Sequence, residues 1–321
     1  MKKALFALGL SALSNSSFAI TNGTVVDWQN DFDDYVTGNC TGLIVGGNQI
    51  LTAAHCSAFE TQVFTHRDEY IDVNSKVNNP LNTGVGINYD VSILNIDIQS
   101  TQNIHFFADL NQATASVGDA VHIFGFAASF TELKRGDSTI SRPSDEALNR
   151  LFHEHALGTS LTQGGDSGSA WFNSSDEVIG VHFGGDSITD LFYSKDFILE
   201  TVNGWHYPTV LKGTGTQTVK IQSLHQNGVT ENAHATGDVQ ILGGTCQTQA
   251  VINAFDTCTY ELEVTGSGQL HLSNDEVIDI NPVTPTPVPP PTTPSSGGSG
   301  GSLGFLSLFG LVLFARLKHT K

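Results

Sequence analysis

Short runs of β-branched and aromatic residues alternate with turn residues along most of this chain of 321 residues. Residues 117–125, for example, read Val-Gly-Asp-Ala-Val-His-Ile-Phe-Gly, an apolar run between glycine-containing turns. Such spacing is typical of antiparallel β-structure with few helices, because frequent turn residues leave room for strands but not for long helices. The pattern extends over residues 20–211, and it predicts an all-β fold for this part of the chain.

A glycine-rich turn at residues 164–169 carries the strongest chemical signal. It reads Gly-Gly-Asp-Ser-Gly-Ser, so Ser167 lies between glycines and directly follows Asp166. A nucleophilic hydroxyl needs open backbone around it, and the N–H groups of Gly165 and Ser167 would converge on the oxyanion of an acyl-transfer reaction. The motif alone has moderate specificity, because turns rich in glycine and serine are common.

Two further motifs lie upstream and complete the order histidine, aspartate, serine. His55 stands in Leu-Thr-Ala-Ala-His-Cys at residues 51–56, and Asp90 begins Asp-Val-Ser-Ile-Leu at residues 90–94. The three motifs together resemble those of chymotrypsin-like serine proteases. The resemblance implies that Ser167 is the nucleophile, His55 the general base and acid, and Asp90 the group that orients the imidazole. It also implies two six-stranded antiparallel barrels with the triad between them.

The first 19 residues predict a secretory signal peptide. A basic start precedes an apolar run, and Ser-Phe-Ala at residues 17–19 forms a small-residue end. Cleavage after Ala19 by signal peptidase would expose Ile20, and the new start, Ile-Thr-Asn-Gly, resembles that of activated members of the same family. The resemblance implies that the freed amine of Ile20 pairs with Asp166 and shapes the oxyanion hole and the pocket.

The residues around the nucleophile also resemble the glutamyl endopeptidase branch of the family. Thr162 lies five positions before Ser167, and His182 lies 15 positions after it in a Gly-Val-His-Phe-Gly-Gly run that ends at Gly185. The resemblance implies that Thr162, His182 and Gly185 bind the carboxylate of a substrate glutamate. Two alternatives stay open: an apolar or relaxed pocket, and a His182 that faces solvent. Leu161 stands where trypsin-type members carry an aspartate, so their preference for Arg or Lys is not expected.

Four cysteines in an exported chain fit two disulfides. The resemblance implies a bridge between Cys40 and Cys56, which flank the turn that carries His55. Cys246 and Cys258 would close a short loop in the C-terminal region. Zinc binding is the alternative, but no Cys-x-x-Cys or His-x-x-x-His spacing supports it, so we expect neither a metal nor a cofactor.

The charge of the chain argues against nucleic-acid binding. It has 14 basic and 32 acidic residues and a formal net charge of −18, whereas a nucleic-acid-binding protein needs a basic face. The resemblance to serine proteases implies protein or peptide substrates as partners.

Residues 213–280 predict a second, small domain. Residues 218–221 and 260–264 read as strands with one buried face, and turn signals recur between them. The pattern favours a β-sandwich of immunoglobulin-like type. It carries no catalytic constellation, so substrate binding, export recognition and spacing all stay open as roles.

The end of the chain predicts a sorting signal. Residues 281–302 form a linker rich first in proline and threonine and then in glycine and serine, and residues 303–321 are an apolar segment with a basic tail. The pattern resembles the GlyGly-CTERM signal of Gram-negative bacteria. It implies transient anchoring in the inner membrane, cleavage by a rhomboid-type protease and type II secretion. A permanent inner-membrane anchor is the alternative.

These observations favour a secreted or cell-surface serine endopeptidase that prefers glutamate on the acyl side of the cut. A binding or adhesion protein on an inert protease fold is the alternative from another class, although the His, Asp and Ser are all present. A protease that processes a single regulatory partner stays equally open.

Overall fold

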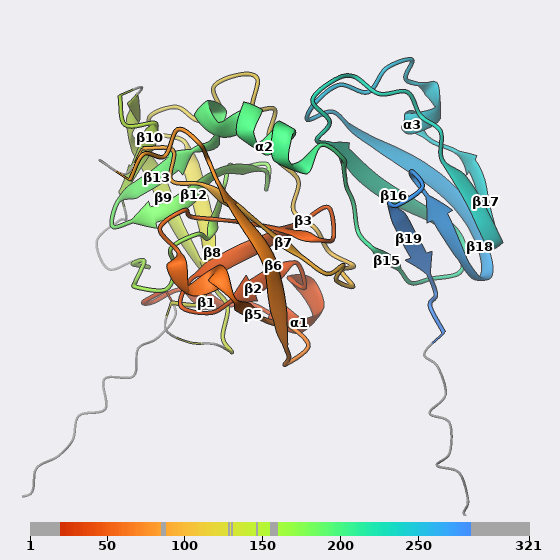
Figure 1. Cartoon of the computed structure of the whole chain (residues 1–321), viewed down its shortest axis with the longest axis horizontal. Helices are drawn as coiled ribbons and strands as arrows, with labels where there is room; N and C mark the ends of the chain where they lie inside the picture. Colours follow the sequence, from red (N-terminus) through yellow and green to blue (C-terminus); the bar gives the residue numbers. More distant parts are fainter. Residues whose placement is uncertain are drawn as a thin grey trace, which may run out of the picture. The chain divides into compact units, whose positions relative to one another are not determined.

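Two six-stranded antiparallel barrels form most of the computed structural model (Figure 1). It describes residues 20–283 apart from residues 85–87, 128, 130, 146 and 155–159. The predicted signal peptide, nearly all of the predicted linker and the predicted sorting tail lie outside these described residues. Within them, no helix is long and apolar enough to cross a membrane.

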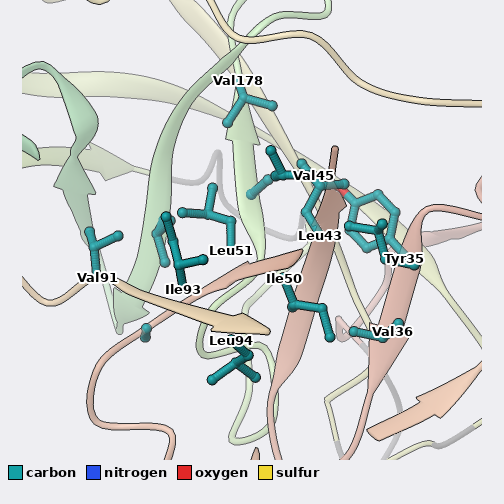
Figure 2. Close-up of a cluster of buried hydrophobic side chains, with 14 of the residues drawn as sticks. Tyr35, Val36, Leu43, Val45, Ile50, Leu51, Val91, Ile93, Leu94 and Val178 are labelled. Atoms are coloured by element: carbon teal, nitrogen blue, oxygen red, sulfur yellow. The ribbon is translucent and has the colours of Figure 1, made fainter. Parts of the chain in front are cut away.

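The first barrel closes in the order β2-β3-β4-β7-β6-β5, and its pairs are antiparallel. Its strands are β2 (Tyr35–Thr37), β3 (Thr41–Val45), β4 (Gln49–Thr52), β5 (Gln62–Thr65), β6 (Tyr70–Asn78) and β7 (Ser92–Ile96). β3 and β4 are buried along their whole length. Figure 2 shows part of the apolar cluster that fills the barrel, including Leu43, Ile50 and Leu94.

The second barrel closes because β8 pairs with β9 as well as with β11. Its strands are β8 (Ala120–Gly125), β9 (Lys134–Asp145), β10 (Arg150–Glu154), β11 (Ala170–Phe172), β12 (Val178–Gly184) and β13 (Ser187–Asp190), and β1 (Thr24–Val25) pairs with β9. Ile20, Trp171 and Ile188 belong to its core. Val178 of β12 packs instead in the cluster of the first barrel, where Figure 2 draws it near Val45, so the two barrels share apolar contacts.

A third sheet follows in the chain. Its strands are β14 (Trp205–His206), β15 (Val210–Leu211), β16 (Gly215–Ser223), β17 (His234–Gly243), β18 (Thr257–His271) and β19 (Val277–Ile280). β18 pairs with β17 along one edge, and with β16 and then β19 along the other. The sheet takes in residues 205–211, which the sequence analysis assigned to the preceding domain. The immunoglobulin-like type and the domain boundaries stay predictions.

The described residues contain few and short helices, as the strand-and-turn pattern predicts. These are α1 (Trp28–Asp31), η1 (Ser57–Glu60), η2 (Leu191–Ser194), α2 (Lys195–Val202) and α3 (Thr245–Thr248). Both expected disulfides are present, Cys40–Cys56 beside the first barrel and Cys246–Cys258 in the C-terminal region.

Candidate active site

His55 and Asp90 meet because of how two strands pair. His55 follows β4, Asp90 precedes β7, and the antiparallel register sets Thr52 opposite Ser92. The Nδ1 atom of His55 lies 2.6 Å from Oδ2 of Asp90, and the backbone N–H of His55 donates to Oδ1 at 2.9 Å. The Asp90 side chain is 2% exposed and that of His55 is 39% exposed. A shielded carboxylate thus holds an imidazole that is open to solvent.

The Ser167 turn depends on two glycines in left-handed conformations. Gly165 has φ +106° and Gly168 has φ +86°, angles that residues with a Cβ adopt only with strain. A Cβ on Gly165 would overlap the carbonyl of Ala127, and one on Gly168 would overlap Thr52 Oγ1 and the Thr41 carbonyl. Gly165 and Gly168 are therefore required both by conformation and by space.

Hydrogen bonds tie this turn to both barrels. The N–H of Thr41, in β3, donates to the Ser167 carbonyl at 2.9 Å, and its hydroxyl donates to the Gly165 carbonyl at 3.0 Å. The N–H of Gly168 donates to the carbonyl of His182, in β12, at 2.9 Å. Among the described residues, the N–H groups of Gly165 and Ser167 have no acceptor of their own, so both are available to a ligand.

Phe183 connects the serine with the histidine, although the sequence analysis gave it no role. The Ser167 hydroxyl donates to the Phe183 carbonyl at 3.5 Å. The Phe183 ring meets the His55 ring edge-on, with centroids 5.4 Å apart. The only sequence signal for Phe183 was its place beside His182 in the glycine-bounded run, and the tertiary contact supplies the rest.

Asp166 is fully buried behind the serine turn. Its carboxylate accepts N–H groups from Ala127 and Gln163, each at 2.7 Å. Burial raises the pKa of Asp166 to about 6, and the two hydrogen bonds act in the opposite direction. A carboxyl group in this condition would gain from a cation, because a nearby positive charge favours its ionised form.

The segment that would follow the predicted cleavage site already lies against the second barrel. Ile20 is fully buried in the core of that barrel. Thr21 exchanges two backbone hydrogen bonds with Leu161, both at 2.9 Å. In the uncleaved chain the nitrogen of Ile20 belongs to an amide, so it carries no positive charge that could pair with Asp166.

The predicted pocket residues fall into two groups. The hydroxyl of Thr162 donates to the Gly185 carbonyl at 3.2 Å, which joins the segment before the serine to the end of β12. His182 is instead 1% exposed, so the alternative of a solvent-facing side chain is wrong. Its Nδ1 accepts the indole N–H of Trp171 at 3.3 Å. Because the indole nitrogen only donates, this contact requires a neutral His182 with its proton on Nε2.

Within the described residues, no group of three or more His, Cys, Asp or Glu side chains gathers as a metal site would require.

Comparisons with known proteins bear on the whole catalytic region. A family model described as Trypsin matches residues 20–195, more than half of the chain. The VesB protease of Vibrio cholerae is similar in structure, with 18% sequence identity, a TM-score of 0.48, and coverage of 81% of this chain and 98% of that one. The secreted serine protease VesC of Vibrio cholerae is also similar, with 15% sequence identity and a TM-score of 0.43. That match covers 77% of this chain and 68% of the VesC chain. No curated protein sequence matches this chain.

Proposed function

Because this chain belongs to the trypsin family and is a chymotrypsin-like serine endopeptidase, we propose that His55, Asp90 and Ser167 are its catalytic triad. The observation that supports this most directly is the contact of 2.6 Å between His55 and Asp90, beside a serine turn that leaves two N–H groups available. An aspartate that accepts the Nδ1 proton leaves Nε2 free to act as a base.

In the proposed mechanism, the Ser167 hydroxyl attacks the scissile carbonyl while His55 accepts its proton. Asp90 keeps the imidazole in the required tautomer and stabilises the imidazolium that forms. The N–H groups of Gly165 and Ser167 donate to the oxyanion. His55 then protonates the leaving amine, which leaves an acyl group on Ser167. Water, activated by His55, hydrolyses this acyl-enzyme and restores the serine.

A fluorophosphonate probe tests the proposal on the purified mature chain. An activated Ser167 reacts with the probe, and Ser167→Ala abolishes both labelling and peptide hydrolysis, with a loss on the order of 10⁴-fold or more in kcat. The variant should melt at a temperature close to that of the wild type, because the hydroxyl makes only one long contact. A folded wild type that does not label would favour the inert binding protein instead.

Export would complete the site. In the proposal, signal peptidase cuts after Ala19, and the new ammonium group of Ile20 pairs with Asp166. The burial of both residues and the raised pKa of Asp166 support this pairing. N-terminal sequencing of the exported protein should give Ile-Thr-Asn-Gly. A chain that begins elsewhere, yet is fully active, contradicts the pairing.

The preference for glutamate is proposed through Thr162, His182 and Gly185. The neutral His182 would donate its Nε2 proton to the substrate carboxylate, with the Trp171 contact fixing that tautomer. A panel of peptides that differ only at the cleaved residue tests the preference. We expect glutamate to exceed glutamine and leucine in kcat/KM, whereas a preference for leucine or phenylalanine favours the apolar pocket.

Trp171→Phe tests whether the contact of Trp171 with His182 supports the proposed preference for glutamate. This change removes the indole N–H that donates to Nδ1 of the buried His182, and the loss of such a hydrogen bond costs about 1–3 kcal/mol. We expect the ratio of kcat/KM for glutamate over glutamine peptides to fall roughly tenfold, because that energy no longer favours the donating tautomer. An unchanged ratio contradicts this function for Trp171.

The proposed location rests on the two ends of the sequence. We propose a protease domain and a small C-terminal β-domain that are exported by the signal peptide, anchored briefly by residues 303–321 and released through rhomboid-type cleavage and type II secretion. The intact mass of the secreted protein tests this, because a product that retains Lys321 contradicts the cleavage.

A further inference from the structure

Two cationic side chains approach the proposed His55–Asp90 pair from different barrels. Lys76 belongs to β6, which pairs with β7 directly after Asp90. Arg150 begins β10 of the second barrel. Both side chains interact electrostatically with Asp90. No sequence motif marks either residue, because each lies in an ordinary strand segment remote from every motif.

Lys76 holds the turn that carries His55. Its Nζ donates to the carbonyls of Ala54 and Cys56, both at 3.0 Å, and these two residues flank His55 in the chain. Burial lowers the pKa of Lys76, while the carboxylates of Glu60 and Asp90 act in the opposite direction. One ammonium group therefore fixes the backbone on both sides of His55.

Arg150 reaches the same pair through an aromatic ring. It is 4% exposed, and its guanidinium carbon lies 3.6 Å from the centroid of the Phe183 ring, a close cation–π contact. The same ring meets His55, and the carbonyl of Phe183 accepts the Ser167 hydroxyl. Guanidinium, phenyl ring and imidazole thus form a continuous contact that ends at the proposed base.

We propose that Lys76 and Arg150 are positioning residues for the protease reaction, which hold the His55 turn and the Phe183 ring. The proposal rests on the proposed triad. The imidazole has to keep a fixed place relative to the Ser167 hydroxyl for proton transfer, and a small displacement slows the chemical step. The two side chains should therefore act on kcat rather than on KM.

The test is kcat and KM for peptide hydrolysis by Lys76→Met and Arg150→Met in the mature enzyme. Each variant should lower kcat roughly tenfold and leave KM nearly unchanged, because the imidazole is held less firmly while the proposed substrate-binding residues are untouched. Arg150→Lys should keep part of the lost kcat, since an ammonium group still makes a cation–π contact but lacks the planar stack.

Lys220→Met is the matched control. Lys220 also packs over an aromatic ring, with its Nζ 4.5 Å from the Phe106 centroid, but it belongs to the C-terminal sheet. This variant should keep the wild-type kcat and KM. If Arg150→Met does not fold, Lys76→Met on the partly exposed strand β6 decides the question.

The outcomes separate this inference from the triad itself. Methionine variants that label with the fluorophosphonate and keep the wild-type kcat overturn the inference while leaving the triad intact. A wild type that fails to label overturns the triad. A loss of activity that appears only as a rise in KM also contradicts the positioning role.

Discussion

The backbone on both sides of Ser167 is tightly constrained. Gly165 and Gly168 hold positive φ angles, and neighbouring backbone occupies the space where a Cβ would lie. Thr41 then fixes the carbonyls of Gly165 and Ser167 from the first barrel. The glycines serve the placement of one hydroxyl and two N–H groups, and their substitution should therefore affect activity as well as stability.

Gly168→Ala should destabilise the fold by about 3 kcal/mol, because it combines a strained φ with an overlap against Thr41 and Thr52. It should also suppress fluorophosphonate labelling. Gly118→Ala is the matched control, since Gly118 has φ +93° but nothing within 4 Å of its Cβ position. That variant should cost about 1 kcal/mol and leave labelling unchanged. Denaturant unfolding and labelling rates measure both effects, and equal labelling by the two variants contradicts the argument.

At the scale of elements, strand pairing brings the proposed catalytic groups together. The β4–β7 register sets Thr52 opposite Ser92, so His55, after β4, and Asp90, before β7, lie at one end of the first barrel. The Cys40–Cys56 disulfide then closes a loop of 16 positions that contains β3 and β4 and ends beside His55. The second disulfide closes 12 positions in the C-terminal region. The two bridges should therefore differ in what their removal does to activity.

Replacing both cysteines of either bridge with alanine should cost about 3 kcal/mol of stability, the value for loops of this length. The Cys40→Ala/Cys56→Ala variant should also lose kcat, because the His55 turn becomes less constrained. The Cys246→Ala/Cys258→Ala variant should keep kcat at a temperature where it is folded. Denaturant titrations and peptide kinetics give both readouts, and a similar loss of kcat in the two variants would show that the first bridge has no special influence on the site.

Over the whole molecule, buried polar groups join the C-terminal sheet to the segment between the barrels. Gln222 of β16 is fully buried; its amide donates to the carbonyls of Phe107 and Phe255 at 2.8 and 3.0 Å, and its Oε1 accepts the Phe107 N–H at 2.9 Å. His206 of β14 accepts the Gly46 N–H at its Nδ1 and donates from its Nε2 to the His105 carbonyl. The C-terminal sheet and the barrels should therefore unfold together.

Gln222→Leu should lower the stability of the whole unit by about 3 kcal/mol, because it leaves buried backbone groups of Phe107 and Phe255 without partners. Gln240→Leu, on the exposed face of β17, is the control and should change stability by less than about 0.5 kcal/mol. Unfolding followed both by peptidase activity and by circular dichroism should give one coincident transition in the wild type. Two separate transitions in the wild type contradict the coupling.

His206 makes this connection sensitive to acid. Burial lowers its pKa to about 4 from the ordinary 6.5, so between these values the unfolded chain binds a proton that the folded chain does not. Stability from neutral His206 is complete above pH 6.5 and falls as the pH drops towards 4, by about 3 kcal/mol in all. His206→Gln should therefore lose less stability than the wild type between pH 7 and pH 4.5. Parallel stability curves for the two proteins would contradict this effect.

The sequence by itself determined the features that depend on short motifs and on local spacing. The alternation of strands and turns indicated an all-β fold, and the glycine motif marked Ser167 as the candidate nucleophile. The cysteine count fitted two disulfides, and the resemblance to chymotrypsin-like proteases implied the two barrels and the pairing of Cys40 with Cys56. Each of these signals lies within a few neighbouring residues or in a short motif. Period and turn chemistry are read along the chain, so they need no knowledge of which distant segments meet.

Only the tertiary structure decided which side chains surround the proposed triad. Lys76, Arg150 and Phe183 gather around His55 because two barrels close and pack together, and no motif marks the first two. The burial of His182 against Trp171 and the links of Gln222 were equally hidden. Alternation in a strand gives two possible faces, and barrel closure selects one of them. The motif that carries the proposed nucleophile is thus local in the sequence, whereas the side chains around the proposed base come from residues far apart in the chain.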